Sequence, residues 1–164
     1  MVKFFLLIGL SILNLQAFSQ DYQWAKCIGK TGTNNNYVSS NGIITDNVRN
    51  IYTTGSFSDT LDFNPGAGVN NLTGTGGYVL KLDSAGNFSW VTYLTATGLD
   101  IKIDAQGNLY VLQANSISKL NASGNIVWVK SISPTFTSFK LDLNANIITA
   151  GYLREPKILT LVQM

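Results

Sequence analysis

Asp59 and Asp62 are the carboxylates whose spacing comes closest to that of a cation site. They stand in the stretch DTLDFNPGAG and could hold Ca²⁺ together with backbone carbonyl oxygens, since calcium prefers oxygen ligands. The alternative role is structural, because an aspartate caps a local turn and the pair Pro65-Gly66 closes it. We expect the structural role and no cofactor, with calcium at the two aspartates as the alternative.

Three further aspartates, Asp83, Asp104 and Asp142, stand at the starts of tight turns. A calcium loop needs alternating oxygen ligands and a closing Glu, whereas each of these turns has one carboxylate. We therefore expect them to stabilise turns rather than to bind metal.

The composition argues against catalysis. The chain has no His, so it lacks the commonest general base and cannot form a Ser-His-Asp triad or a zinc site with His ligands. The only Glu is Glu155. We predict a protein that is not an enzyme, and the alternative is an extracellular hydrolase or lyase that acts on glycans with acids and tyrosines alone. An aromatic platform for glycans could be formed by tyrosines, although strand packing explains them as well: Tyr37, Tyr52, Tyr78, Tyr93 and Tyr110.

The N-terminus has the pattern of a secretory signal peptide. Lys3 precedes an apolar run over residues 4–15 and then small or polar residues, so we expect a signal at 1–19 that is cleaved before Gln20. The alternative is an uncleaved anchor, but the run is shorter than the roughly 20 residues of a membrane span. We predict a secreted or cell-surface protein with no membrane span after signal removal.

Charge and cysteine content set further limits. Without Lys3 the chain keeps ten of its 11 basic residues against nine acidic ones, and this balance does not favour a nucleic-acid partner. Cys27 is the single cysteine, so no internal disulfide is expected.

An internal repeat organises the rest of the chain. KLDSAGNFSW ends at Trp90 and KLNASGNIVW ends at Trp128, 38 residues later. Each phrase has a turn glycine, Gly86 or Gly124. A second phrase occurs three times and begins with Asp, has Asn at its fifth position and continues into an apolar stretch: Asp46 with Asn50, Asp104 with Asn108, and Asp142 with Asn146.

The repeat unit predicts four short strands. LDIKID alternates apolar and polar residues, NLYVLQ and NIVWVK are apolar on both faces, and DAQGN and NASGN read as hairpin turns of type I with a Gly bulge. A period near 40 residues with two hairpins per unit is typical of β-propeller blades. The sequence therefore predicts an all-β, β-propeller-like array of four-stranded antiparallel blades, with Trp24, Trp90 and Trp128 in outermost strands.

We expect blades at 41–90 and 98–128, a partial blade at 136–164, and a strand at 21–30 that could close a ring. The first blade carries an insertion at 56–77, rich in Gly and Asn.

The residues of the first unit resemble a known family. Asp46, the strand at 50–52, the turn at 54–57, the loop at 62–66 and the close at 81–90 are similar to the SBBP-type β-propeller repeat of secreted bacterial proteins. The resemblance implies an exported propeller that is often part of a much longer protein. A weaker likeness of NLYVLQANSISKLNASGNIVW to quinoprotein propellers is a remote alternative, because no residues match a quinone site.

The number of blades is too small for a closed ring, which has 4 to 8. An open array would leave an apolar face of about 400 Å² at each end, which forfeits on the order of 10 kcal/mol of burial. We therefore expect a fragment of a longer propeller with its remaining blades in cis, and the alternative is self-assembly of copies into a ring. The predicted function is that of a noncatalytic scaffold or binding module for a protein or glycan ligand.

Overall fold

The computed structural model describes residues 24–29, 37–132 and 136–151, and every regular element in these ranges is a β-strand. The strands are β1 (Tyr37–Thr45), β2 (Ile51–Ser58), β3 (Thr60–Asp62), β4 (Asn71–Thr73), β5 (Gly76–Leu82), β6 (Phe88–Leu94), β7 (Gly98–Ile103), β8 (Leu109–Gln113), β9 (Ser116–Leu120), β10 (Ile126–Ser131), β11 (Phe136–Leu141) and β12 (Ile147–Gly151). The prediction of an all-β chain is confirmed. No helix in the described ranges has the length and apolar character that a membrane crossing requires.

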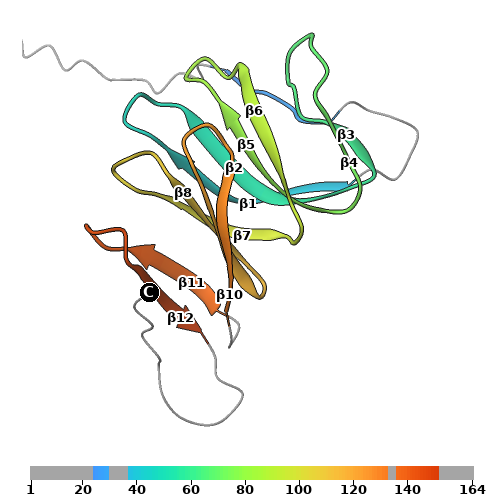
Figure 1. Ribbon diagram of the computed structural model, residues 1–164. Helices are drawn as coiled ribbons and strands as arrows, with labels where there is room; N and C mark the ends of the chain where they lie inside the picture. The colour runs from blue at the N-terminus through green and yellow to red at the C-terminus, as the bar shows by residue number, and fades with distance from the viewer. Residues whose placement is uncertain (1–23, 30–36, 133–135, 152–164) are drawn as a thin grey trace, which may run out of the picture.

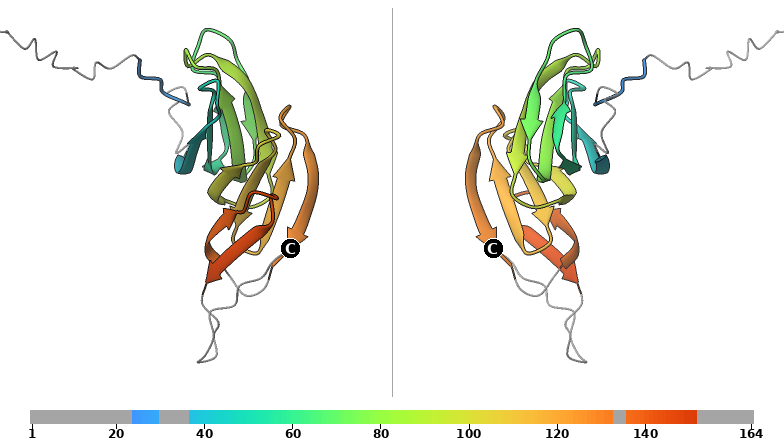
Figure 2. Two further views of the ribbon diagram at one scale, coloured as in Figure 1. Left: turned by 90° about the vertical axis from the view of Figure 1, so that its left-hand side faces the viewer. Right: turned by 90° about the vertical axis from the view of Figure 1, so that its right-hand side faces the viewer.

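Two sheets have the four antiparallel strands of a propeller blade. In blade 1 the strand order is β1-β2-β5-β6, and in blade 2 the order is β7-β8-β9-β10. β11 and β12 form a third, two-stranded sheet. The innermost strand β7 packs against both β1 and β11, so the sheets follow one another as an open array (Figure 1, Figure 2).

The blades are slightly longer than the sequence predicts. Blade 1 runs from Tyr37 to Leu94 and blade 2 from Gly98 to Ser131, against the expected 41–90 and 98–128. The repeat phrases end at Trp90 and Trp128, inside the outermost strands, so the predicted blades stop before the ends of β6 and β10. The part of the predicted blade at 136–164 that follows residue 151 lies outside the described residues.

One turn design recurs five times, at residues 46–50, 83–87, 104–108, 121–125 and 142–146. The Oδ1 atom of the first residue, Asp or Asn121, accepts the N–H groups two and four residues ahead. The fourth N–H donates to the first carbonyl, and the fourth residue has a positive φ. The predicted type I turn with a bulge is thus present, but Arg49 and Ala145 hold the place that glycine fills elsewhere.

Three apolar clusters hold the array together. One lies between blades 1 and 2 and includes Tyr52, Val79 and Ile101, and a second lies between blade 2 and the third sheet and includes Tyr110 and Phe139. Both follow from the apolar residues on each face of the middle strands, because such strands need packing partners on both sides.

The third cluster lies on the face of blade 1 that points away from blade 2. Phe63, from the insertion, is fully buried there against Phe57 and Tyr78. Leu61 and Leu72 of the insertion and Trp24 and Ile28 of the N-terminal segment complete the cluster. The expectation of a bare apolar face at this end is therefore wrong, because the chain covers that face with its own hairpin.

The insertion predicted at 56–77 is itself ordered. β2 and β5 extend into the predicted range, and between them β3 pairs with β4 as an antiparallel hairpin. The Gly- and Asn-rich composition identified the excursion but did not reveal that its apolar residues form part of the core.

Two tryptophans, one in an outermost strand and one in the N-terminal segment, pack on turn glycines of the blade that follows them in the chain. Trp90 in β6 lies against Gly124, where a Cβ atom would come within 2.8 Å of the indole ring. Trp24 lies in the same way against Gly86, with 3.0 Å to the ring, and its Nε1 donates to the carbonyl of Ser84 over 3.3 Å. Each glycine is needed because a side chain would occupy the space of the ring.

Candidate binding groove

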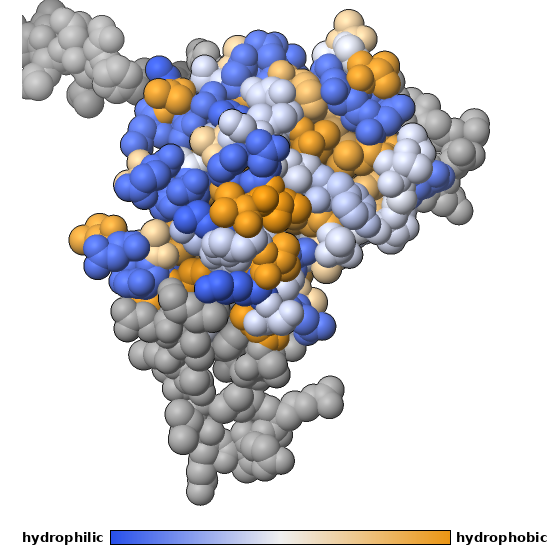
Figure 3. All heavy atoms as spheres, viewed as in Figure 1, coloured by the Kyte–Doolittle hydropathy of each residue, from blue (hydrophilic) through white to orange (hydrophobic). Residues whose placement is uncertain are grey.

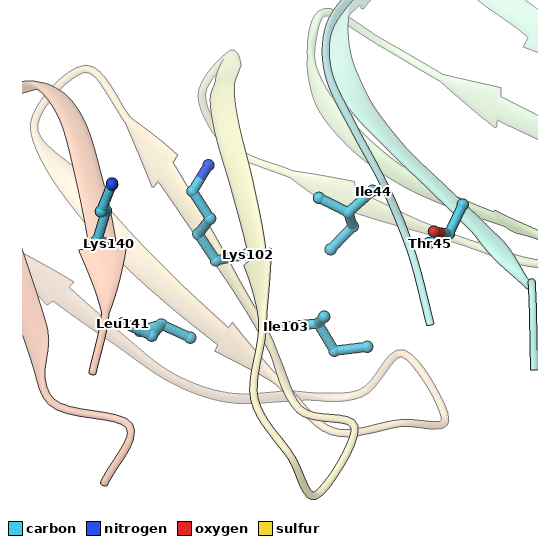
Figure 4. A pocket seen from close by; sticks show the side chains of 6 residues that line it. All are labelled: Ile44, Thr45, Lys102, Ile103, Lys140 and Leu141. Carbon is cyan, nitrogen blue, oxygen red and sulfur yellow. The ribbon is translucent and has the colours of Figure 1, made fainter. Parts of the chain in front are cut away.

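A groove runs between the innermost strands where they approach their first turns. Its cavity of about 480 Å³ is lined by Ile44 and Thr45 of β1, Lys102 and Ile103 of β7, and Lys140 and Leu141 of β11. Three inner strands thus each contribute an adjacent pair of residues. Figure 4 shows the aliphatic side chains along the groove and the two lysines extending in the same direction from neighbouring strands.

The two lysines differ in their surroundings. Lys102 donates to both carboxylate oxygens of Asp100, over 2.6 and 2.8 Å, and its ammonium lies 5.4 Å from the centre of the Phe139 ring. Lys140 is exposed on β11, and no ion pair joins it to a carboxylate of the described residues. The groove therefore has one cation that a ligand could bind directly and one that already shares its charge with Asp100.

A second cavity, of about 300 Å³, continues the groove between the first turns of the two blades. It is lined by residues 45–48 and 103–107, and the two cavities share Thr45 and Ile103. Val48 is 70% exposed at its rim. The two cavities therefore form one groove, with aliphatic side chains and two lysines in its first part and the polar residues of two turns, including Asp46 and Asp104, in its second part.

The carboxylates of Asp46 and Asp104, which line this second cavity, accept hydrogen bonds within their own turns. Burial alone would raise the pKa of Asp104, but hydrogen bonds from Asn108, Gln106 and Tyr110 bring that pKa below its ordinary value. The pKa of Asp46 is lowered by the same kind of balance, with Asn50 as the main donor. A carboxylate that is ionised and hydrogen-bonded in this way is poorly suited to proton transfer near neutral pH.

The other described aspartates are engaged as well. Hydrogen bonds from Asn87 and Asn146 lower the pKa values of Asp83 and Asp142. Asp59 accepts the N–H of Thr60, and Asp62 accepts the N–H groups of Asn64 and Asn70. Within the described ranges no cluster of three or more His, Cys, Asp or Glu side chains could hold a metal ion.

The residues predicted from the repeat are dispersed over the blades. Trp90 and Trp128 lie in the outermost strands β6 and β10, and Trp24 lies in the N-terminal segment, for which no strand is assigned. The five tyrosines do not form one platform, because Tyr52, Tyr78 and Tyr110 are buried.

Sequence reasoning missed Lys102 and Lys140. A signal was present, since each stands two residues before a repeat aspartate, Asp104 or Asp142, on an innermost strand. The alignment of repeats placed them at one register, but only the packing of β7 beside β11 brings them to one groove.

Comparison with known proteins finds a matching repeat family and similar solved structures. Residues 23–56 match the model of the SBBP β-propeller repeat. Among solved structures, a protein of unknown function from Bacteroides caccae is 13% identical, with a TM-score of 0.37, over 68% of this chain and 52% of that chain. The chain thus corresponds to about half the length of that structure. The search of curated proteins found no match.

Proposed function

Because the chain carries an SBBP β-propeller repeat at residues 23–56, we propose that it is a noncatalytic propeller module of the cell surface or the extracellular medium. Its function is to bind a protein or glycan ligand in the groove along β1, β7 and β11. The ligand contacts the aliphatic side chains of the groove, and Lys140 contributes a charge in its first part. No cofactor takes part in this function.

The observation that supports binding over catalysis is the state of the carboxylates. Every aspartate in the described ranges has a hydrogen-bond or ion-pair partner. General acid–base chemistry needs a group whose pKa lies near the working pH, whereas four turn aspartates have lowered pKa values. An apolar groove with a few placed polar groups is the usual form of a binding site.

Export is the second part of the proposal. It rests on the signal-like segment at 1–19. N-terminal sequencing of protein recovered from the culture medium or the cell surface should begin at Gln20. Retention of residues 1–19 by the recovered protein would contradict cleavage.

Binding can be separated from turnover by one pair of assays. We expect the full chain to bind members of a glycan array that includes neutral and acidic oligosaccharides, and to release no products from the corresponding polysaccharides. Turnover that disappears on changing Asp59 or Asp62 would overturn the proposal in favour of the glycan hydrolase or lyase.

Variants of two lysines test the location of the site. Lys140→Ala should weaken binding of acidic ligands by about tenfold, which corresponds to roughly 1.4 kcal/mol, because it removes the accessible charge of the groove. Lys130→Ala on the outermost strand β10 is the charge-matched control and should leave binding unchanged. Equal effects of both variants would show that binding reflects net charge rather than the groove.

Calcium is tested by thermal unfolding. The carboxylate of Asp62 already accepts two backbone N–H groups, so we expect the same Tm with calcium and with a chelator. A Tm that falls on chelation would assign the insertion a calcium site.

A further inference from the structure

The charged side chains of the groove along β1, β7 and β11 form two groups of opposite sign. Its first part has Lys102 and Lys140, and Asp100 offsets the charge of Lys102. Its second part has Asp46 and Asp104, one from the first turn of each blade. The first part therefore carries a net positive charge and the second part a net negative charge.

The two carboxylates of the second part keep their charge near neutral pH. Burial alone would raise the pKa of each, but hydrogen bonds from their own turns hold both pKa values below the ordinary one. Each carboxylate accepts two backbone N–H groups, an asparagine amide and a tyrosine hydroxyl, which fill the roughly four acceptor positions of a carboxylate. No ion pair joins either of them to a lysine or arginine of the described residues. They therefore attract a ligand cation through their charge rather than through a new hydrogen bond.

Aliphatic side chains lie along the first part of the groove. Ile44, Ile103 and Leu141 are half-buried, so each keeps part of its surface for a ligand. Ile44 points from β1 toward β7, and Leu141 points from β11 toward β7 (Figure 4). Among the described residues no aromatic side chain lines either part, whereas sugar rings are usually recognised on aromatic faces. These walls suit aliphatic side chains better than a carbohydrate.

Two strands that line the groove also have backbone groups to offer. Within the described ranges β1 pairs with β2 alone and β7 pairs with β8 alone, so each is an edge strand of its sheet. The N–H and C=O groups of an edge strand can pair with an extended peptide. A carbohydrate has no matching row of alternating donors and acceptors.

We propose that the ligand of the groove is an extended peptide with an acidic side chain in the first part, aliphatic side chains along its walls, and a basic side chain in the second part. The acidic side chain pairs with Lys140, which no ion pair joins to a carboxylate of the described residues. The basic side chain lies near the carboxylates of Asp46 and Asp104. This inference rests on the proposed function, because it assigns a ligand class to the groove proposed there as the binding site.

The order of charges along the peptide matters more than its net charge. A peptide with acids at both ends places one of them near Asp46 and Asp104, and a peptide with bases at both ends places one of them near Lys140. Like charges that meet across an interface are unfavourable. A dipolar peptide should therefore bind more tightly than either of these.

Labelled synthetic peptides that share one aliphatic centre test the proposal by fluorescence anisotropy with the full chain. The dipolar peptide has a pair of Glu residues at one end and a pair of Lys residues at the other, and it is made in both orders because either chain direction is possible in the groove. The acidic peptide has Glu at both ends and the basic peptide has Lys at both ends. We expect one dipolar order to bind about tenfold more tightly than the acidic and basic peptides. Equal affinities, or tightest binding of the acidic peptide, would overturn the proposal.

Reversal of one charge tests where the peptide binds. Lys140→Glu should weaken binding of the dipolar peptide by about tenfold and strengthen binding of the basic peptide by a similar factor. Lys130→Glu on β10 makes the same change in net charge and should leave the order of affinities unchanged. Asp104→Asn should bring the affinity of the acidic peptide closer to that of the dipolar peptide. An unchanged order of affinities in Lys140→Glu would contradict the assignment.

The peptide assignment and the proposed function fail in different ways. If no peptide binds, but acidic glycans bind and Lys140→Glu abolishes their binding, the groove is a binding site and the peptide assignment is wrong. If Lys140→Glu changes the binding of neither glycans nor peptides, the function proposed for the groove is wrong as well.

Discussion

At the scale of the residue, the hairpins depend on turns in which one Asp or Asn side chain accepts backbone N–H groups that have no partner in the sheet. In the turn at 104–108 the two oxygens of Asp104 accept two backbone N–H groups and the side-chain amide of Asn108. The same pairing explains why Asp and Asn recur four residues apart. The turn also requires a positive φ at its fourth residue. Three of the five turns have glycine there, whereas the other two have Arg49 and Ala145.

Reciprocal substitutions at two turns should show the cost of the left-handed conformation. Arg49 has a φ of 65° and Gly107 a φ of 82°. An L-residue pays about 1–2 kcal/mol in this region, so Arg49→Gly should raise the free energy of unfolding and Gly107→Ala should lower it by about that amount. A Cβ at Gly107 would meet only Ala122, at 3.6 Å, so the change isolates the backbone term. Chemical denaturation measures both, and a stabilising Gly107→Ala would contradict the account.

Stability should decrease in acid because of these carboxylates. The pKa values of Asp46 and Asp104 are lower in the folded chain than the ordinary value, so the unfolded chain binds more protons in the interval between the two values. Stability is therefore present above about pH 4 and is lost as pH falls through the folded pKa values.

Asp104→Asn tests this linkage. Asn121 shows that an amide oxygen can accept the two backbone N–H groups, so the variant should fold, with a lower Tm at pH 7 and a smaller loss of Tm between pH 7 and pH 3. An unchanged loss of Tm would show that Asp104 does not contribute to the acid sensitivity.

At the scale of the element, the sequence predicted the strands and turns better than it predicted the insertion. Alternation in LDIKID and the Asp-to-Asn spacing located β7 and the turns, because strand period and turn chemistry are local properties. The role of Phe63 could not be predicted in this way. Its neighbours Phe57 and Tyr78 are brought to it by the folding back of β3 and β4 on the blade, which is a tertiary effect.

Phe63→Ala should therefore destabilise the whole domain. The side chain is fully buried, and removing a buried Phe typically costs about 3–5 kcal/mol. Val69→Ala in the same insertion is the control, because Val69 is 63% exposed and should change stability little. Urea denaturation compares the two, and equal small effects would show that the hairpin does not belong to the core.

At the scale of the whole molecule, the blades join through the inner strands and through the tryptophan–glycine contacts. The repeat predicted the spacing of the tryptophans but not their partners, since the glycine that meets Trp90 lies in another blade. The groove was missed for the same reason. Periodicity gives the register of Lys102 and Lys140 within each unit, whereas the packing of successive sheets decides which units lie side by side.

Gly124→Ala should weaken the junction of blades 1 and 2 more than Gly107→Ala weakens a turn. Both glycines have similar positive φ values, 84° and 82°, but a Cβ at Gly124 would also overlap the ring of Trp90. The difference between the two losses should be about 1–3 kcal/mol, the usual cost of overpacking. Equal losses would show that the indole moves aside freely.

The outermost strand of blade 2 exposes several apolar side chains. Ile126, Val127 and Val129 on β10 are 46–56% exposed, and apolar atoms gather where this strand crosses the front of the molecule (Figure 3). β10 is the edge of its sheet, and exposed apolar edge strands invite pairing with other chains.

The contrast between the two blades has a consequence for protein engineering. Blade 1 carries a hairpin between β2 and β5, whereas the equivalent strands of blade 2, β8 and β9, are joined by Ala114 and Asn115 alone. The same four-stranded framework thus accepts either a minimal turn or a folded excursion at this point. The Ala114–Asn115 turn is therefore a natural graft position, at which a foreign peptide could be displayed on a scaffold that already tolerates such an addition in its neighbouring blade.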